Sequence, residues 1–119
     1  LNPHPTWAGG ALNMADHTAV GRAVPDACRD AGNRWVFPDQ LAGGLEPWDG
    51  VRRVAFAASP QPTHAVDVTT TWERGEASLE QHRVYLDSVG RPEFLRPMAE
   101  AVGAEVGCDL AVSWEVHDL

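Results

Sequence analysis

Long apolar runs and basic residues are both scarce in these 119 residues. The longest apolar run, residues 54–58, is far shorter than the roughly 20 residues that cross a bilayer, so we expect no membrane span. Nine Lys and Arg stand against seventeen Asp and Glu, and the formal net charge of -8 would repel the phosphates of a nucleic acid. We therefore expect no nucleic-acid partner.

Cysteine is also scarce, and the two that occur, Cys28 and Cys108, lack the Cys-x-x-Cys spacing of zinc knots. This usage favours two free thiols and a cytoplasmic location over a disulfide scaffold. The chain opens with Leu1 in a loop rich in Pro and Gly, without a basic and apolar leader. We interpret residues 1–119 as a single partial domain of a longer protein.

The apolar periodicity predicts an α/β chain with the order helix, long loop, strand, short strand, two helices, strand. The first helix begins near Asp16 as its N-cap, and Pro25 predicts a kink or break within it. The apolar face of the last helix is expected to be Phe94, Leu95, Met98, Val102 and Val106. The expected elements are a helix near 16–33, a loop over 33–50, strands at 51–58 and 65–69, helices at about 71–88 and 94–106, and a strand at 108–116.

Histidine is the most informative residue type, because it titrates near neutral pH and is the commonest zinc ligand. His17 follows Asp16 at the predicted helix start, where the carboxylate could orient an imidazole. An exposed first-turn histidine beside a capping residue is the simpler explanation of the same pair. Both interpretations of His17 stay open on spacing alone.

His64 lies in a turn made rigid by Pro60 and Pro62, and Asp67 follows three residues later. A rigid, loop-borne histidine suits catalysis. In an extended strand Asp67 would point to the opposite face from His64, so direct pairing requires a bend; the alternative is that Asp67 closes the next turn. The sequence does not decide between these two interpretations.

The remaining histidines are expected to have no role in a site. His82 belongs to the apolar stripe of a predicted helix, and His4 and His117 fall in predicted flexible ends. The chain also lacks Gly-x-Ser-x-Gly, Gly-x-Gly-x-x-Gly, P-loop and His-Glu-x-x-His motifs. These absences disfavour serine hydrolases, Rossmann dehydrogenases and metalloproteases of the zincin type.

Four segments together resemble the C-terminal half of the PIG-L (LmbE-like) N-deacetylases. They are residues 13–21 (NMADHTAVG), 33–41 (NRWVFPDQL), 44–48 (GLEPW) and 62–69 (PTHAVDVT), in the same order as in the family. The resemblance runs from about Asn13 to Gly90 and more loosely to the last strand. It implies a Rossmann-like three-layer α/β/α sandwich, of which these residues form the C-terminal half.

The resemblance also implies an activity, the removal of an N-acetyl group from an N-acetylglucosamine-type or related glycoconjugate substrate by zinc-activated water. By that resemblance His17 is the third zinc ligand, Asp16 supports it, and His64 steadies the oxyanion. The charge of Asp67 is expected to keep His64 protonated. Met14 stands where several members have a histidine that tunes the general base. The family's early His-Pro-Asp-Asp-Glu segment, which supplies the other two zinc ligands and the base, is absent from this sequence.

Two further hypotheses remain beside the deacetylase. In the first, the chain is a non-catalytic carbohydrate-binding module in which the loop aromatics Trp35, Phe37 and Trp48 grip a sugar. In the second, it is a structural α/β module without a metal site, whose exposed sheet edge requires a partner chain. An upstream His-Pro-Asp-Asp segment in the gene would favour the deacetylase. The sequence carries no signal for a particular oligomeric state.

Overall fold

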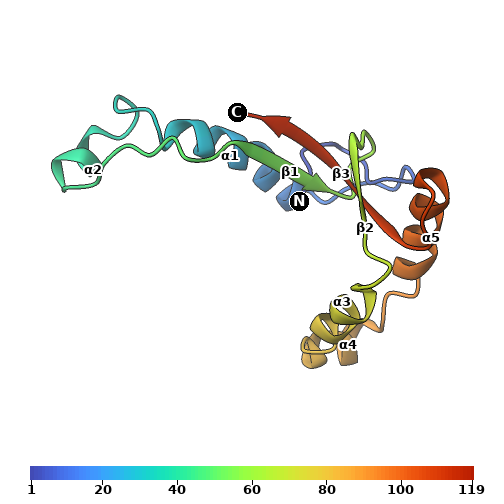
Figure 1. The fold of residues 1–119 in the computed structure, drawn as a ribbon. Helices are drawn as coiled ribbons and strands as arrows, with labels where there is room; N and C mark the ends of the chain where they lie inside the picture. The colour runs from blue at the N-terminus through green and yellow to red at the C-terminus, as the bar shows by residue number, and fades with distance from the viewer. The chain divides into compact units, whose positions relative to one another are not determined.

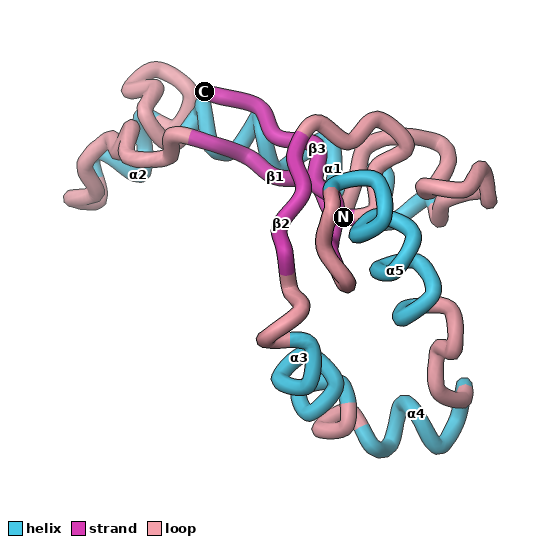
Figure 2. Tube along the Cα trace, turned by 45° about the vertical axis from the view of Figure 1, so that its right-hand side comes forward, coloured by secondary structure: helices cyan, strands magenta, loops and turns pink.

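The computed structural model describes all residues from 1 to 119, and its contacts divide the chain into two compact units. Unit 1 comprises Leu1–His64 and Trp114–Leu119, and unit 2 comprises Ala65–Ser113. The elements, in chain order, are α1 (Ala15–Asp30), α2 (Pro38–Ala42), β1 (Arg53–Ala57), β2 (His64–Asp67), α3 (Trp72–Leu79), α4 (Arg83–Val89), α5 (Leu95–Val106) and β3 (Ala111–Asp118) (Figures 1 and 2).

The three strands form one sheet in the order β1-β3-β2. β1 runs antiparallel to β3, with Arg53 opposite Asp118 and Ala57 opposite Trp114. The predicted alternation in β1 is confirmed, because Val54 and Phe56 are buried while the residue between them is exposed. The mixed α/β character is therefore as predicted, with a small antiparallel sheet.

The first helix differs from its prediction in two respects. Asp16 is not the N-cap, because α1 begins at Ala15 and Met14 holds the extended cap conformation without a side-chain cap bond. Pro25 does not break the helix, which continues to Asp30. A proline costs a helix interior about 3 kcal/mol, and the other backbone hydrogen bonds of this 16-residue helix keep it continuous.

The long loop also contains an element that the sequence did not predict. Pro38 opens α2, a single short helix, where its fixed φ suits the first turn and its missing N–H removes no bond. The predicted short strand is confirmed as β2, whose four residues are all exposed.

In unit 2 the predicted helix over 71–88 is two helices, α3 and α4, separated at Glu80–His82. His82 leaves helical geometry with φ -85° and ψ 43°. No residue of either helix is buried, so no buried face stabilises one continuous helix over this segment. Thr71 occupies the N-cap position of α3 without a side-chain cap hydrogen bond.

The buried face of α5 is not the predicted one. Ala99 and Gly103 are buried, whereas Phe94, Leu95 and Met98 are exposed. The chain turns back tightly after Gly107, which has φ +84°, and a Cβ on Gly103 would lie 2.6 Å from the carbonyl oxygen of Cys108. The close approach of this turn therefore selects the small residues of α5 for the inside.

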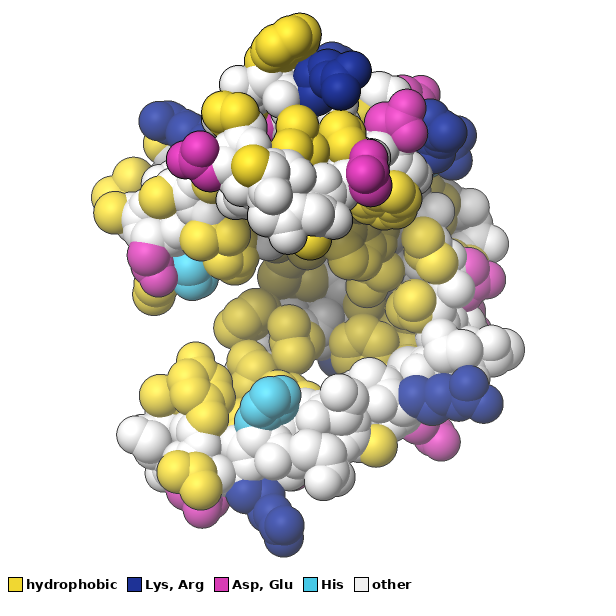
Figure 3. Space-filling view, turned by 90° about the vertical axis from the view of Figure 1, so that its left-hand side faces the viewer, with side chains coloured by type: hydrophobic (Ala, Val, Ile, Leu, Met, Phe, Trp, Pro, Cys, Tyr) yellow, Lys and Arg dark blue, Asp and Glu magenta, His cyan; other side chains and the backbone are white.

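The apolar core is small, and many large apolar side chains stay at the surface. Figure 3 shows them in yellow across the face that it displays. Exposed patches of this kind mark surfaces that another part of a protein or a partner covers. The buried apolar residues are Val54, Phe56, Ala99, Leu110 and Ala111, and the exposed ones include Leu12, Met14, Val20 and Val24 in unit 1 and Phe94, Leu95, Met98 and Val106 in unit 2.

No helix of this chain combines the length and the apolar character that a membrane crossing requires. Both cysteines are free thiols, as predicted.

Gly21→Ala should destabilise unit 1, because the new Cβ would lie 2.5 Å from the backbone of Asn2 and Pro3. Overpacking against a backbone costs about 1–3 kcal/mol. A lowered urea midpoint, followed by tryptophan fluorescence, would show the loss. Gly75→Ala is the matched control: it also lies within a helix, its new methyl group would meet no atom within 4 Å, and it should keep or raise stability. Equal midpoints for the two variants would contradict the packing of α1 on the amino-terminal segment.

Candidate functional site

His17 lies in the first turn of α1 and is partly buried against the amino-terminal loop. The edge of its ring packs on Trp7, with ring centroids 5.4 Å apart and planes 76° from parallel. Its Nδ1 atom is buried and has no hydrogen-bond partner. A buried polar atom without a partner is costly, so this nitrogen is the clearest place in unit 1 for a ligand atom that the protein itself does not supply.

Asp16 is exposed, with its Oδ2 atom 3.9 Å from Nε2 of His17. That separation is too long for a hydrogen bond but places a negative charge beside the imidazole. The charge favours a proton on Nε2, and in the neutral ring this leaves the lone pair on Nδ1. The carboxylate of Asp16 therefore lies beside the His17 ring, without a hydrogen bond to it.

The side chains of this chain do not form a complete zinc site. No three His, Cys, Asp or Glu side chains come together in a group that could hold a metal ion. A catalytic zinc typically has three protein ligands. His17 offers one suitable nitrogen, so residues 1–119 fit one corner of such a site.

His64 is exposed at the start of β2, and Thr63 controls its orientation. The Thr63 hydroxyl accepts a hydrogen bond from the backbone N–H of Val116 at 2.9 Å and lies 2.9 Å from Nδ1 of His64. The hydroxyl can donate to Nδ1 when the neutral ring carries its proton on Nε2, and it can accept from Nδ1 in the other tautomer and in the protonated ring.

Asp67 is exposed, and its Oδ1 atom accepts a hydrogen bond from the backbone N–H of Thr69 at 2.9 Å. Hydrogen bonds from the side chain and backbone of Thr69 lower the pKa of Asp67. No hydrogen bond joins Asp67 to His64; the carboxylate closes the turn, which is the alternative that the sequence left open. Burial, and then the charge of Asp67, raise the pKa of the nearby Cys108 thiol.

A cluster that the sequence analysis missed is centred on Glu115, whose side chain is only 7% exposed. Its Oε2 atom accepts hydrogen bonds from Nε2 of His4 at 2.6 Å and from the Ser59 hydroxyl at 2.5 Å. Its Oε1 atom accepts one from Nε2 of His117 at 2.7 Å. Three segments distant in sequence therefore meet at one carboxylate.

Burial acts to raise the pKa of Glu115, but the hydrogen bonds from Ser59, His4 and His117 outweigh it. The net result is a pKa below the ordinary value, so the carboxylate is ionised at neutral pH.

Two asparagines extend this cluster toward α1. Asn2 is fully buried; its Nδ2 atom donates to the carbonyl of Ala58 at 3.0 Å and its Oδ1 accepts from the backbone N–H of His4. Asn13 donates from Nδ2 to the carbonyls of Asn2 and His4. The cluster therefore fixes the segment that leads into α1, two residues before the helix begins.

The expectation that His4 and His117 lie in flexible ends was wrong. Pro3 and Pro5 flank His4 and restrict the backbone, and His117 packs its ring on Phe56 at a centroid distance of 5.8 Å. One signal in the sequence could have indicated the cluster: Glu115 is a carboxylate directly between the apolar residues Trp114 and Val116 of β3.

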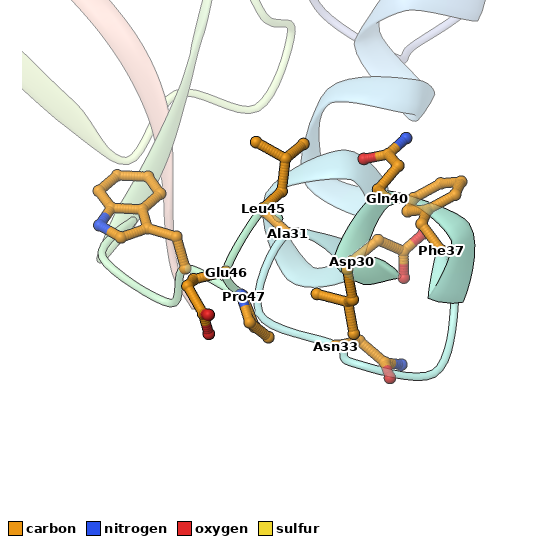
Figure 4. A pocket seen from close by; sticks show the side chains of 10 residues that line it. Asp30, Ala31, Asn33, Phe37, Gln40, Leu45, Glu46 and Pro47 are labelled. Carbon is orange, nitrogen blue, oxygen red and sulfur yellow. The ribbon is translucent and has the colours of Figure 1, made fainter. Parts of the chain in front are cut away.

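The predicted aromatic loop forms a shallow cavity of about 190 Å³ at the end of α1. Phe37 and Trp48 line it, together with Asp30, Gln40 and Glu46 (Figure 4). Trp35 does not line it and is 82% exposed. The loop therefore places two of its three large aromatics at a cavity.

No protein-family model and no curated protein matches this sequence. Among solved structures it matches an N,N'-diacetylchitobiose deacetylase from Pyrococcus horikoshii, determined in complex with its inhibitor MPG, with a TM-score of 0.73. The fold of this chain is therefore similar to part of the fold of that deacetylase. The match covers 87% of this chain at 20% identity but only 40% of the deacetylase chain. The family resemblance is thus confirmed as a likeness of fold over part of a domain.

Replacing Glu115 by Gln should lower the stability of unit 1 at neutral pH by about 1–3 kcal/mol, because the amide leaves one or more buried donors without an acceptor. The lowered pKa of Glu115 sets the direction of the pH dependence of stability. The ionised carboxylate stabilises the fold above the ordinary pKa of a carboxyl group, and this stabilisation is lost as the pH falls through the lowered pKa. Urea unfolding between pH 7 and pH 3 should therefore show a weaker acid dependence in Glu115→Gln.

The matched control is Glu105→Gln, at an exposed position of α5, which should leave both the midpoint and the acid dependence unchanged. An unaltered acid profile in Glu115→Gln would show that this carboxylate is not the anchor of the cluster.

Proposed function

We propose that this chain is part of a zinc-dependent N-deacetylase that hydrolyses the N-acetyl amide of an N-acetylglucosamine-type or related glycoconjugate. The proposal rests on one observation above all, the fold match to a deacetylase over 87% of the chain. In this proposal residues 1–119 are the C-terminal half of a three-layer α/β/α sandwich, and the free thiols suit a cytoplasmic setting.

His17 is the residue that we assign to the metal. Its buried Nδ1 has no hydrogen-bond partner within the chain, and the Asp16 carboxylate lies 3.9 Å from its Nε2. Bound zinc supplies water of lowered pKa to such a reaction. The remaining ligands belong to a part of the domain beyond these residues.

His64 is the residue that we assign to the developing oxyanion. When water adds to an amide carbonyl, negative charge gathers on the oxygen, and a positioned N–H donor stabilises it. Nε2 of His64 is a donor in the protonated ring, and also in the neutral ring when the Thr63 hydroxyl donates to Nδ1. In this scheme Asp67, three residues further along β2, adds negative charge on the same strand as His64.

Binding without catalysis is the second candidate, and the cavity beside Phe37 and Trp48 favours it. Hydrolysis of the acetyl group separates the two candidates, because a binding module would leave the amide intact. The encoding gene offers a simpler check: an upstream His-Pro-Asp-Asp segment is expected only for the deacetylase.

His17→Ala in the full polypeptide should abolish stoichiometric zinc binding, because one of three ligands is lost. Elemental analysis after dialysis measures the zinc content directly. His82→Ala, which changes the exposed N-cap of α4, is the control and should keep the metal. An unchanged zinc content in His17→Ala would refute its assignment as a ligand.

His64→Ala should keep the zinc and lower kcat by about 10²- to 10³-fold, the usual effect of removing one oxyanion donor. Release of acetate from N,N'-diacetylchitobiose is the assay, with zinc content measured on the same samples. Thr63→Val removes the hydroxyl that orients the ring and should give a smaller loss. A wild-type rate in His64→Ala would remove this residue from the site.

A further inference from the structure

The cavity at the carboxyl end of α1 has an unusual charge for a helix terminus. The last turns of a helix carry partial negative charge on their free carbonyl groups, so cations are favoured there and anions are not. Here Asp30 is the last residue of α1 and is partly buried. Its charge therefore adds to that of the helix end.

A second carboxylate lines the same cavity, and no Lys or Arg does. Glu46 lies among the lining residues, with the neutral amides of Asn33 and Gln40. Figure 4 shows Asp30, Gln40 and Phe37 on one side of the cavity and Glu46 with Pro47 on the other. Arg29, in the last turn of α1, and Arg34, next to Asn33, do not line the cavity, so the two carboxylates are the only charged side chains in its lining.

Aromatic surface completes the lining. Phe37 is 49% exposed and Trp48 is 60% exposed, which leaves their rings open to a ligand. The Trp48 indole lies so close to Gly50 that a Cβ there would overlap it, and its backbone N–H donates to the carbonyl of Ala31 at 2.8 Å. An aromatic face beside carboxylates suits an organic cation, through cation–π attraction and charge-assisted hydrogen bonds.

We propose that this cavity binds a primary ammonium group carried on a compact ring, and that it excludes the uncharged amide of the same compound. The size of the cavity, about 190 Å³, suits one small ring rather than an extended ligand. The inference rests on the proposed function in one respect only, which is that hydrolysis of an N-acetyl amide yields such an ammonium product with acetate. The cavity would then retain units whose acetyl group has already been removed.

Three sugars that differ only at C2 provide the test: glucosamine, N-acetylglucosamine and glucose. They are titrated at low ionic strength and pH 6 into the whole polypeptide, with the indole N–H signals of the five tryptophans observed by NMR. Glucosamine should shift the Trp48 signal without moving that of Trp35, and should bind about tenfold more tightly than the other two. Equal affinity for all three sugars would overturn the proposal, as would the absence of any shift at Trp48.

Charge-neutral variants separate the cavity from general surface charge. Asp30→Asn should reduce glucosamine affinity to that of glucose, whereas Asp39→Asn, at an exposed position of α2 outside the lining, should leave it unchanged. Trp48→Ala and Trp35→Ala form a second pair, with a loss expected only in the former. Equal losses in either pair would overturn the proposal.

The sugar-binding test can succeed or fail whether or not the protein is a deacetylase. Release of acetate from N,N'-diacetylchitobiose is measured separately on the same samples. Selective glucosamine binding without acetate release would contradict the proposed function and support the cavity, whereas acetate release without selective binding would do the reverse.

Discussion

A single ionised carboxylate organises unit 1. Glu115 is buried at its position on β3. Hydrogen bonds from His4, Ser59 and His117 offset the free-energy cost of removing its charge from water. A buried charge without such partners would be strongly destabilising. The amino-terminal segment, the turn after β1 and the last strand therefore share one polar anchor, which couples their positions despite the limited apolar core.

The same carboxylate bears indirectly on the candidate site. His4 and Asn2 hold Asn13, and Asn13 immediately precedes the N-cap of α1. The position of His17 in the first turn thus depends on hydrogen bonds that begin at β3. A chain that buries few apolar residues has used polar contacts to define where its helix starts.

Local pattern predicted much of the secondary structure, because alternation in β1 and apolar spacing in α5 are properties of short segments. The pattern failed where tertiary contact decides. The inner face of α5 is set by the turn at Gly107, and the break between α3 and α4 reflects the absence of a covering layer. His17 and Asp16 were found from their neighbours in sequence, whereas the partners of Glu115 lie 111 and 56 residues away, at separations that no local pattern reveals.

β3 is the central strand of the sheet, so β1 and β2 are its edge strands. Each edge strand has one side along which no further strand pairs with it. β2 carries no lysine or proline, the residues that commonly blunt such margins, and all four of its side chains are exposed. Another strand laid alongside would find unpaired donors and acceptors already spaced for it. The short length of β2 and the charge of Asp67 limit how far such pairing along this margin can extend.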